Sequence, residues 1–198
     1  NDINNGKQIV SQLVHRGPDN KQVFIDDNKK VFFGHNRLSI IYPSPLGNQP
    51  KTKGKYSIIF NGEIYNHLAL RNEINNLNRS NKFSNSWLGS SDTETLLRCF
   101  EIWGFEKTLS KLVGMFSICL FDKELKVLHL ARDRIGEKPL YYGHINNSFV
   151  FSTLSVGSCM PSNSCNVNRC SEFAAFFALM DKSVFLFAST SPPICLPT

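Results

Sequence analysis

The chain has 198 residues, of which 41% are hydrophobic, a composition typical of a globular protein with one sizeable core. The formal net charge is +6, but the basic residues are scattered, with no run longer than Lys29-Lys30, which argues against a nucleic-acid-binding stripe. The six cysteines form no CxxC pair, and the longest apolar stretches are too short to cross a bilayer. We therefore expect free thiols in a reducing, cytoplasmic setting, and neither a metal site, a membrane nor a nucleic acid as partner.

Hydrophobic periodicity divides the first 154 residues into strands, then helices, then strands again. Glycine, proline and asparagine clusters separate these segments. In chain order we expect a helix over 6–14, strands over 22–26 and 30–41, a loop over 42–55, a strand over 55–60, helices over 67–77, 90–104 and 105–114, and two hairpins over 115–133 and 139–153. This order predicts a layered α+β domain with largely antiparallel sheets, rather than a doubly wound parallel fold.

The composition changes after residue 154. Serine, cysteine, asparagine and proline dominate SVGSCMPSNSCNVN, and the chain closes with the proline-containing stretch STSPPICLPT. We therefore expect one domain over 1–154 and a connector over 155–198 that holds one helix near RCSEFAAFFALM. A proline-rich end after such a connector suggests a chain that is cut short.

Several polar clusters interrupt the apolar patterns, and each allows a structural and a functional interpretation. HRGPD predicts a turn that ends a helix, and DRIGEKPLYY fits a charged turn before a hairpin. Arg37 lies in a strand-like run, where it could be a solvated edge residue or a bidentate clamp for a carboxylate. Ser91 or Asp92 can cap the helix that follows, with Glu94 at capping-box distance from Ser91, and Asp92 could instead hold a ligand ammonium.

Asn61-Gly62 is the most informative cluster because it follows directly on the apolar run YSIIF. Acyl transfer needs hydrogen-bond donors aimed at the oxygen that becomes negative, and an asparagine amide with a glycine backbone N–H would supply two. Glycine also permits close approach of a substrate. With Arg37 for a carboxylate, and Glu63 and Asp92 for an ammonium, such a site would recognise a free amino acid. Glutamine fits best and asparagine less well, but the site lacks a nucleophile.

Seven motifs, in their order and spacing, resemble the class II glutamine amidotransferase domain of asparagine synthetases. They are HRGPDN, RLSII, LGNQP, NGEIYNHLALRNEI, SDTETLL, LVGMFSICLFD and ARDRIGEKPLYY. The resemblance implies an N-terminal-nucleophile hydrolase fold, a four-layer αββα sandwich of antiparallel sheets between helices, with its first strand missing. It also implies hydrolysis of glutamine to glutamate and ammonia.

The resemblance further implies a role for each of nine residues. Arg37 binds the glutamine α-carboxylate, and the backbone of Arg37, Leu38, Ser39, Ile40 and Ile41 lines the pocket. Asn61 and Gly62 form the oxyanion hole, and Glu63 and Asp92 contact the α-amino group.

Two features of the family pattern are not found in the sequence. The family's nucleophile is an N-terminal cysteine whose own α-amine is the general base, but this sequence begins with Asn1 and none of its cysteines is terminal. The family also continues into a synthetase domain that uses ATP and Mg²⁺ to activate aspartate, and its Gly-rich pyrophosphate loop does not occur here. We therefore expect the glutaminase domain of an asparagine synthetase that is inactive as given and needs no cofactor itself. Loss of the first strand would expose a sheet edge and reduce stability.

Two alternatives stay open. One is a non-catalytic amino-acid-binding or interaction module that keeps the site without the cysteine. The other is an amidotransferase domain that serves a different ammonia acceptor, such as a sugar or a lactam-forming enzyme. The sequence is also compatible with a homodimeric parent protein whose synthetase domain lies in the same chain.

Overall fold

The structure is a computed structural model that describes residues 2–28, 30–39, 44–79, 87–145, 148–153, 175–181 and 185–190. Its elements in chain order are α1 (Asp2–Gln12), η1 (Val14–Arg16), β1 (Asn20–Ile25), β2 (Val31–Arg37), η2 (Pro45–Gly47), β3 (Lys51–Lys53), β4 (Tyr56–Ile64), α2 (His67–Arg79), α3 (Asp92–Trp103), α4 (Phe105–Lys111), β5 (Gly114–Asp122), β6 (Val127–Arg132), β7 (Tyr141–Ile145), β8 (Ser148–Ser152), β9 (Ala175–Asp181) and β10 (Phe185–Thr190).

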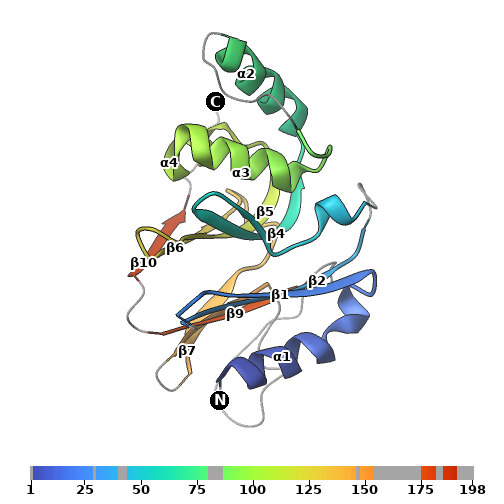
Figure 1. Ribbon diagram of the computed structural model, residues 1–198, viewed down its shortest axis with the longest axis vertical. Coiled ribbons are helices and arrows are strands. Elements are labelled where there is room, and N and C mark those ends of the chain that lie inside the picture. Colours follow the sequence, from blue (N-terminus) through green and yellow to red (C-terminus); the bar gives the residue numbers. More distant parts are fainter. Residues whose placement is uncertain are drawn as a thin grey trace.

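Two five-stranded sheets lie face to face between helices (Figure 1). The first sheet has the strand order β1-β2-β9-β8-β7 and carries α1 on its outer face. The second has the order β10-β6-β5-β4-β3 and is covered by α3 and α4, with α2 packed against α3. The described strand pairs are antiparallel except for β10 and β6, which are parallel. The predicted α+β class with largely antiparallel sheets is therefore confirmed.

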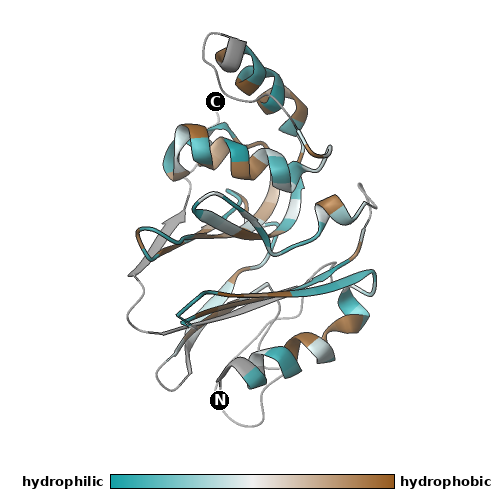
Figure 2. Cartoon of the chain, in the orientation of Figure 1, coloured by the Kyte–Doolittle hydropathy of each residue, from teal (hydrophilic) through white to brown (hydrophobic). Residues whose placement is uncertain are grey.

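Two buried clusters hold the layers together. One lies between the sheets and includes Phe33 and Ile59, and the other lies between the second sheet and the helices and includes Ile58 and Phe60. Apolar residues alternate with polar ones along α1 and α3, as expected for helices with one face on a sheet (Figure 2). Because side chains alternate along a strand, the β4 residues that follow Ile59 at every second position face the space between the sheets.

Two predicted strand ends are wrong. β4 does not stop before Asn61 but continues to Ile64, paired with β5 throughout. The strand predicted over 30–41 ends at Arg37, followed by Leu38 and Ser39 without regular structure, while Ile40 and Ile41 lie outside the described residues. The loop predicted over 42–55 also contains the short strand β3. A glycine that tolerates an unusual φ lets β4 continue where the sequence suggests a turn.

The helix predicted near 169–180 is also wrong where the structure describes it. Residues Ala175–Asp181 form β9, which pairs with β2 on one side and with β8 on the other. A short apolar run has no clear periodicity, and here the pairing with two strands decides its conformation. β9 thus fills the centre of the first sheet, where a missing first strand was expected to leave an exposed edge. The division of the chain at residue 154 remains a prediction, although β9 and β10 both belong to the sheets.

Candidate functional site

Asn61, Gly62 and Glu63 lie in β4, and Asp92 contacts the edge of β4 beyond the point where its neighbour β3 ends. β3 pairs only with the beginning of β4, up to Ile58. Further along, the Phe60 N–H donates to Gln49 Oε1 at 2.6 Å, and the Ile64 N–H donates to Asp92 Oδ2 at 3.3 Å. Two side chains therefore take the place of a neighbouring strand on this edge.

Gly62 lies between these two side-chain contacts. Its partner in β5, Phe116, directs both backbone groups away from β4: the Phe116 N–H donates to Asp133 Oδ2 at 3.2 Å, and the Phe116 carbonyl accepts from the Asp133 N–H at 2.8 Å. Gly62 and Phe116 are thus a non-hydrogen-bonded pair of the antiparallel ladder. The Gly62 N–H consequently points to the same edge as those of Phe60 and Ile64.

The backbone at Gly62 can be formed only by glycine. Its φ is +146°, and an added Cβ would lie 2.1 Å from the Met115 carbonyl oxygen and 2.7 Å from Phe116 Cα. On the facing strand, a Cβ on Gly114 would lie 2.1 Å from the Glu63 carbonyl oxygen. The two glycines therefore let β4 and β5 approach closely where the Gly62 N–H is presented.

Asn61 points from β4 into the space between the sheets and is only 4% exposed. It lies opposite Ser117 in β5, whose hydroxyl donates to the carbonyls of Lys138 and Pro139 at 3.2 and 2.8 Å. The DRIGEKPLYY stretch therefore acts as the predicted turn, and it is fastened to β5 behind Asn61. The Asn61 amide and the Gly62 N–H are adjacent donors at the end of the core.

Arg37 approaches from the other sheet, at the end of β2. Its Nη1 donates to the Ser44 carbonyl and to Asn48 Oδ1, both at 2.9 Å. Burial lowers the pKa of Arg37, while the negative charges of Asp19 and Asp92 act in the opposite direction. Arg37 and Asp92 therefore lie close enough to interact, although they belong to different layers. A ligand carboxylate at Arg37 would share the guanidinium with the loop that carries Ser44 and Asn48.

The HRGPD motif forms the predicted turn and also fixes the end of β2. Pro18 bridges to Arg37, and the Asp19 N–H donates to the Arg37 carbonyl at 3.1 Å. One carboxylate oxygen of Asp19 accepts from the Ser39 N–H at 2.6 Å. The half-buried Leu38 lies between these two contacts. The turn thus positions the predicted carboxylate clamp.

Asp92 is the first residue of α3 and bridges this helix to β4. Its Oδ1 accepts from the Thr93 N–H at 2.8 Å, while its Oδ2 holds the Ile64 N–H. Burial raises the pKa of Asp92; the two N–H contacts lower it, and the nearby Glu63 carboxylate raises it. Asp92 and Glu63 therefore form a pair of neighbouring acidic groups, which a ligand ammonium would stabilise.

Sequence reasoning missed two residues that shape the site, Gln49 and His35. Gln49, 6% exposed, donates from Nε2 to Thr93 Oγ1 at 3.4 Å while its oxygen holds β4. His35 lies close to the Phe60 backbone, and neither of its ring nitrogens has a hydrogen-bond partner. Burial lowers the pKa of His35 to about 4, so the ring is neutral near pH 7. The LGNQP motif contains Gln49 but does not indicate its contact with β4.

The described cysteines do not supply a nucleophile. Cys99 of α3 is buried between the helices and the second sheet, and Cys119 of β5 is buried between the two sheets. Burial raises the pKa of Cys99 to about 12 and that of Cys119 well above its usual value, so both stay protonated at neutral pH. The other four cysteines lie outside the described residues.

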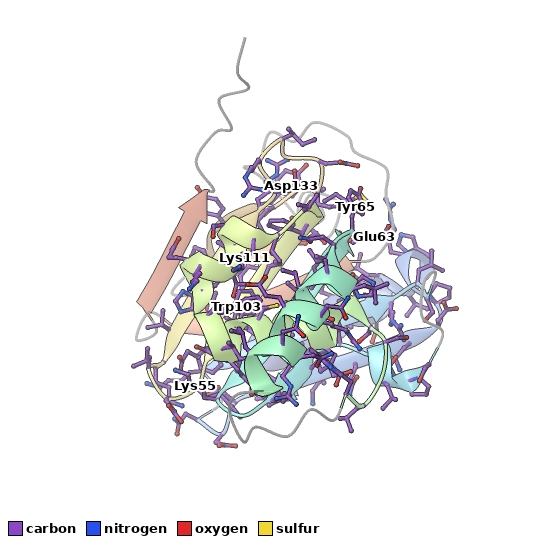
Figure 3. The ribbon with its side chains drawn as sticks, turned by 90° about the horizontal axis from the view of Figure 1, so that it is seen from above. Lys55, Glu63, Tyr65, Trp103, Lys111 and Asp133 are labelled. Carbon is purple, nitrogen blue, oxygen red and sulfur yellow. The ribbon has the colours of Figure 1, made fainter. Side chains whose placement is uncertain are left out.

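In the part of the chain that the structure describes, there is neither a candidate metal site nor a helix that could span a membrane. This part contains no group of three His, Cys, Asp or Glu side chains that could hold a metal ion. None of its helices is long and apolar enough to cross a membrane. In a view from the helical side, Glu63, Tyr65 and Asp133 lie near one another, to one side of the contact between Lys111 and Trp103 (Figure 3).

The fold and the site together define a class of enzyme domain. A model of the glutamine amidotransferase domain family matches residues 2–189, and the chain belongs to this family. It is a class II domain, homologous to the N-terminal part of glutamine-hydrolysing asparagine synthetases.

Individual relatives support this assignment. Glutamine-hydrolysing asparagine synthetases 1 and 3 of Bacillus subtilis are 38% and 36% identical to it over 167 and 150 residues, covering 82% and 74% of this chain. Amidase chry2 of Gibberella zeae is 35% identical over 156 residues, or 74% of this chain. The chain spans only 24%, 23% and 22% of the length of these three proteins.

A solved structure supports the fold alone. Glutamine phosphoribosylpyrophosphate amidotransferase from B. subtilis superposes with a TM-score of 0.55 at 17% identity, covering 89% of this chain and 38% of that one.

Proposed function

We propose that this domain binds glutamine at the open edge of β4 and, when an N-terminal cysteine is present, hydrolyses it to glutamate and ammonia. In this proposal Arg37 binds the α-carboxylate, and Glu63 with Asp92 binds the α-ammonium. The Gly62 N–H and the Asn61 amide stabilise the oxyanion that forms at the side-chain carbonyl. The backbone after Arg37, at Leu38 and Ser39, lines the substrate.

The observation that carries this proposal is the direction of the Gly62 N–H. It points to an edge where the neighbouring N–H groups are held by Gln49 and Asp92, and it lies next to the buried Asn61. Two neighbouring donors, with a guanidinium and two carboxylates for the charged ends, suit an acyl group on a zwitterion. By name, the asparagine synthetase relatives from Bacillus subtilis are glutamine-hydrolysing enzymes.

Chemistry at this site needs a nucleophile that the described residues do not supply. In this family the terminal thiol adds to the glutamine amide carbon as its α-amine takes up the thiol proton. That proton then passes to the amide nitrogen, which leaves the tetrahedral intermediate as ammonia. Water then releases glutamate from the thioester. We infer that the 198-residue polypeptide binds glutamine without turning it over.

Calorimetric titration with glutamine tests the binding step. Arg37→Ala should abolish measurable binding, because a charge-assisted contact to the carboxylate is lost. Arg134→Ala is the matched control: this half-buried arginine donates to the Leu112 carbonyl at 3.1 Å, outside the proposed site. Equal glutamine affinity in Arg37→Ala and the unmodified chain would contradict the assignment.

Ammonia release tests the catalytic step. The unmodified polypeptide should release none from glutamine above the rate without protein. Detectable release that Arg37→Ala abolishes would show that a nucleophile is present after all, and the inferred inactivity would be wrong.

The ammonia acceptor is a separate proposal. We propose aspartate, activated with ATP and Mg²⁺ in a synthetase domain, by similarity to the asparagine synthetase relatives. The similarity to an amidase keeps a different acceptor as the second candidate. Formation of asparagine by a longer polypeptide that carries this domain would decide between them.

A further inference from the structure

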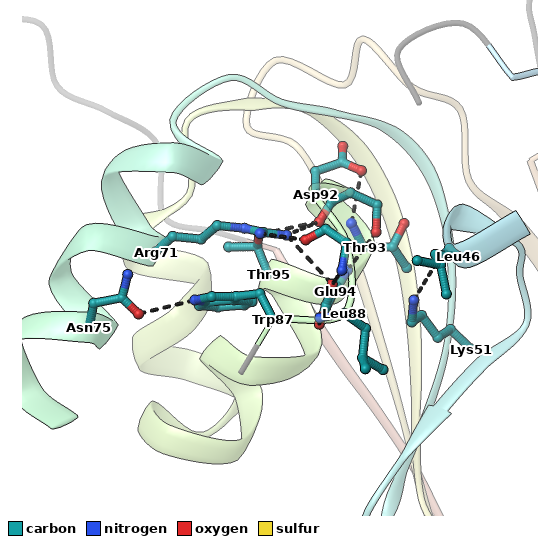
Figure 4. Close-up of polar contacts among 12 residues, drawn as sticks. Leu46, Lys51, Arg71, Asn75, Trp87, Leu88, Asp92, Thr93, Glu94 and Thr95 are labelled. Atoms are coloured by element: carbon teal, nitrogen blue, oxygen red, sulfur yellow. Dashed lines mark hydrogen bonds and ion pairs between the residues drawn. The ribbon is translucent and has the colours of Figure 1, made fainter. Parts of the chain in front are cut away.

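A buried arginine on α2 fastens the loop that leads into α3 (Figure 4). Arg71 Nε donates to Thr95 Oγ1 at 2.7 Å, Nη1 to the Gly89 carbonyl at 2.7 Å, and Nη2 to the Ser91 carbonyl at 2.8 Å. Its guanidinium also lies 4.2 Å from the centre of the Trp87 ring. One side chain thus holds the loop 87–91 at three places and ties it to the first turn of α3.

Glu94 holds the same loop by accepting hydrogen bonds from the backbone N–H groups of the loop. Its two carboxylate oxygens accept from the Leu88 and Gly89 N–H groups at 2.8 and 2.9 Å, and one of them lies 3.8 Å from Arg71 Nη2. Ser91 is the N-cap of α3, and its hydroxyl accepts from the Glu94 N–H at 3.3 Å. Of the two predicted caps, Ser91 is therefore confirmed. Arg71 and Glu94 together fix both the carbonyl and the N–H groups that precede Asp92.

We propose that Arg71 is a positioning residue that sets Asp92 for recognition of a ligand ammonium. This inference rests on the proposed function of the site. Asp92 follows directly on Ser91, whose carbonyl Arg71 holds, and reaches across to the Ile64 N–H of β4 at 3.3 Å. If the loop shifts, the Asp92 carboxylate moves relative to β4 and to Glu63.

The effect of Arg71 is transmitted through geometry rather than through its charge. Its positive charge is paired with Glu94, and the groups that shift the pKa of Asp92 after burial are the Ile64 and Thr93 N–H groups, His67 and Glu63. Lysine would keep the charge but cannot direct hydrogen bonds from a planar fork to three acceptors. Arg71→Lys should therefore loosen the loop while leaving the local charge balance unchanged.

The test compares two ligands that differ only in the ammonium. Glutaramate has the carboxylate and the amide of glutamine but lacks the α-amino group, so the ratio of its dissociation constant to that of glutamine reports ammonium recognition alone. We expect the unmodified chain to prefer glutamine, and Arg71→Lys to reduce this preference about tenfold. Arg134→Lys, a change in another arginine that donates to backbone carbonyls, should leave the ratio unchanged.

Hydrogen exchange provides a second readout that needs no ligand. The Ile64 and Thr93 N–H groups donate to Asp92, so their amide hydrogens should exchange faster in Arg71→Lys. The Phe60 N–H donates to Gln49, so its exchange rate should not change. Global destabilisation would accelerate all three. Glu94→Gln is a second variant. The introduced side-chain amide has one acceptor oxygen for the two N–H groups of Leu88 and Gly89, so this variant should give the same exchange pattern.

The outcomes separate the two proposals. If the unmodified chain binds neither ligand, the proposed function fails, and unchanged exchange at Ile64 and Thr93 in Arg71→Lys would overturn the positioning role as well. If the unmodified chain prefers glutamine and Arg71→Lys retains that preference, the positioning role alone is wrong. Loss of the preference with selective exchange at these two amides supports it.

Discussion

Replacing Gly62 by alanine tests how closely β4 and β5 approach at the site. The new Cβ would lie 2.1 Å from the Met115 carbonyl oxygen, whereas ordinary contacts of a Cβ are at 3.4–4 Å. Relief requires a backbone shift of about 1 Å in a close-packed sheet, an overpacking cost of about 1–3 kcal/mol. Holding alanine at a φ of +146° adds about 1–3 kcal/mol. We therefore expect the free energy of unfolding to fall by about 3 kcal/mol.

Urea denaturation followed by circular dichroism would measure this loss, and the melting temperature should fall by roughly 6–12 °C. Gly143→Ala in β7 is the control, since its added Cβ meets nothing within 4 Å. That control should change the free energy of unfolding by less than about 1 kcal/mol. Equal urea midpoints for Gly62→Ala and the control would refute the close approach of β4 and β5.

Three further predictions concern groups around the site. Gln49→Ala leaves the buried Phe60 N–H without its acceptor and should lower the free energy of unfolding by about 1–3 kcal/mol in urea titrations; an unchanged midpoint would contradict the contact. Because burial lowers the pKa of His35 from 6.5 to about 4, the unfolded chain binds a proton between these pH values that the folded chain does not. The free energy of unfolding should therefore be highest above pH 6.5 and fall as the pH decreases from 6.5 to 4. His35→Gln should make this fall smaller, and parallel curves of unfolding free energy against pH for the two proteins would contradict the prediction. Iodoacetamide at neutral pH should modify Cys99 and Cys119 only after unfolding, as peptide mass spectrometry can show, and labelling of either in the folded protein would disprove their burial.

Local patterns predicted most of the architecture. The helix expected over 90–104 is α3, because its apolar residues recur at helical spacing behind the Ser91 cap. The order of strands and helices also identified the layered α+β class. Such patterns succeed where burial on one face of an element decides its conformation.

The supports of the site could not be predicted in this way. Gln49 lies in a stretch that has the composition of a loop, and its contact with Phe60 depends on the chain folding back across the end of β3. Arg71 lies next to the buried Leu70 on α2, and the acceptors that it binds come from residues about twenty positions later. Both residues lie within motifs of the family resemblance, but their contacts could not be predicted because they are tertiary.

The edge of β4 also bears on association between molecules. A strand with a free edge offers a row of N–H and C=O groups to which another chain can add, and this is a common route to aggregation. Here the amide of Gln49 and the carboxylate of Asp92 occupy the positions on either side of Gly62. Only the Gly62 N–H lies between the two held N–H groups of Phe60 and Ile64 on this edge. This interval is too short for an incoming strand to form a ladder but long enough for a single oxygen atom. The same two side chains therefore keep the edge open to a small ligand and closed to another polypeptide.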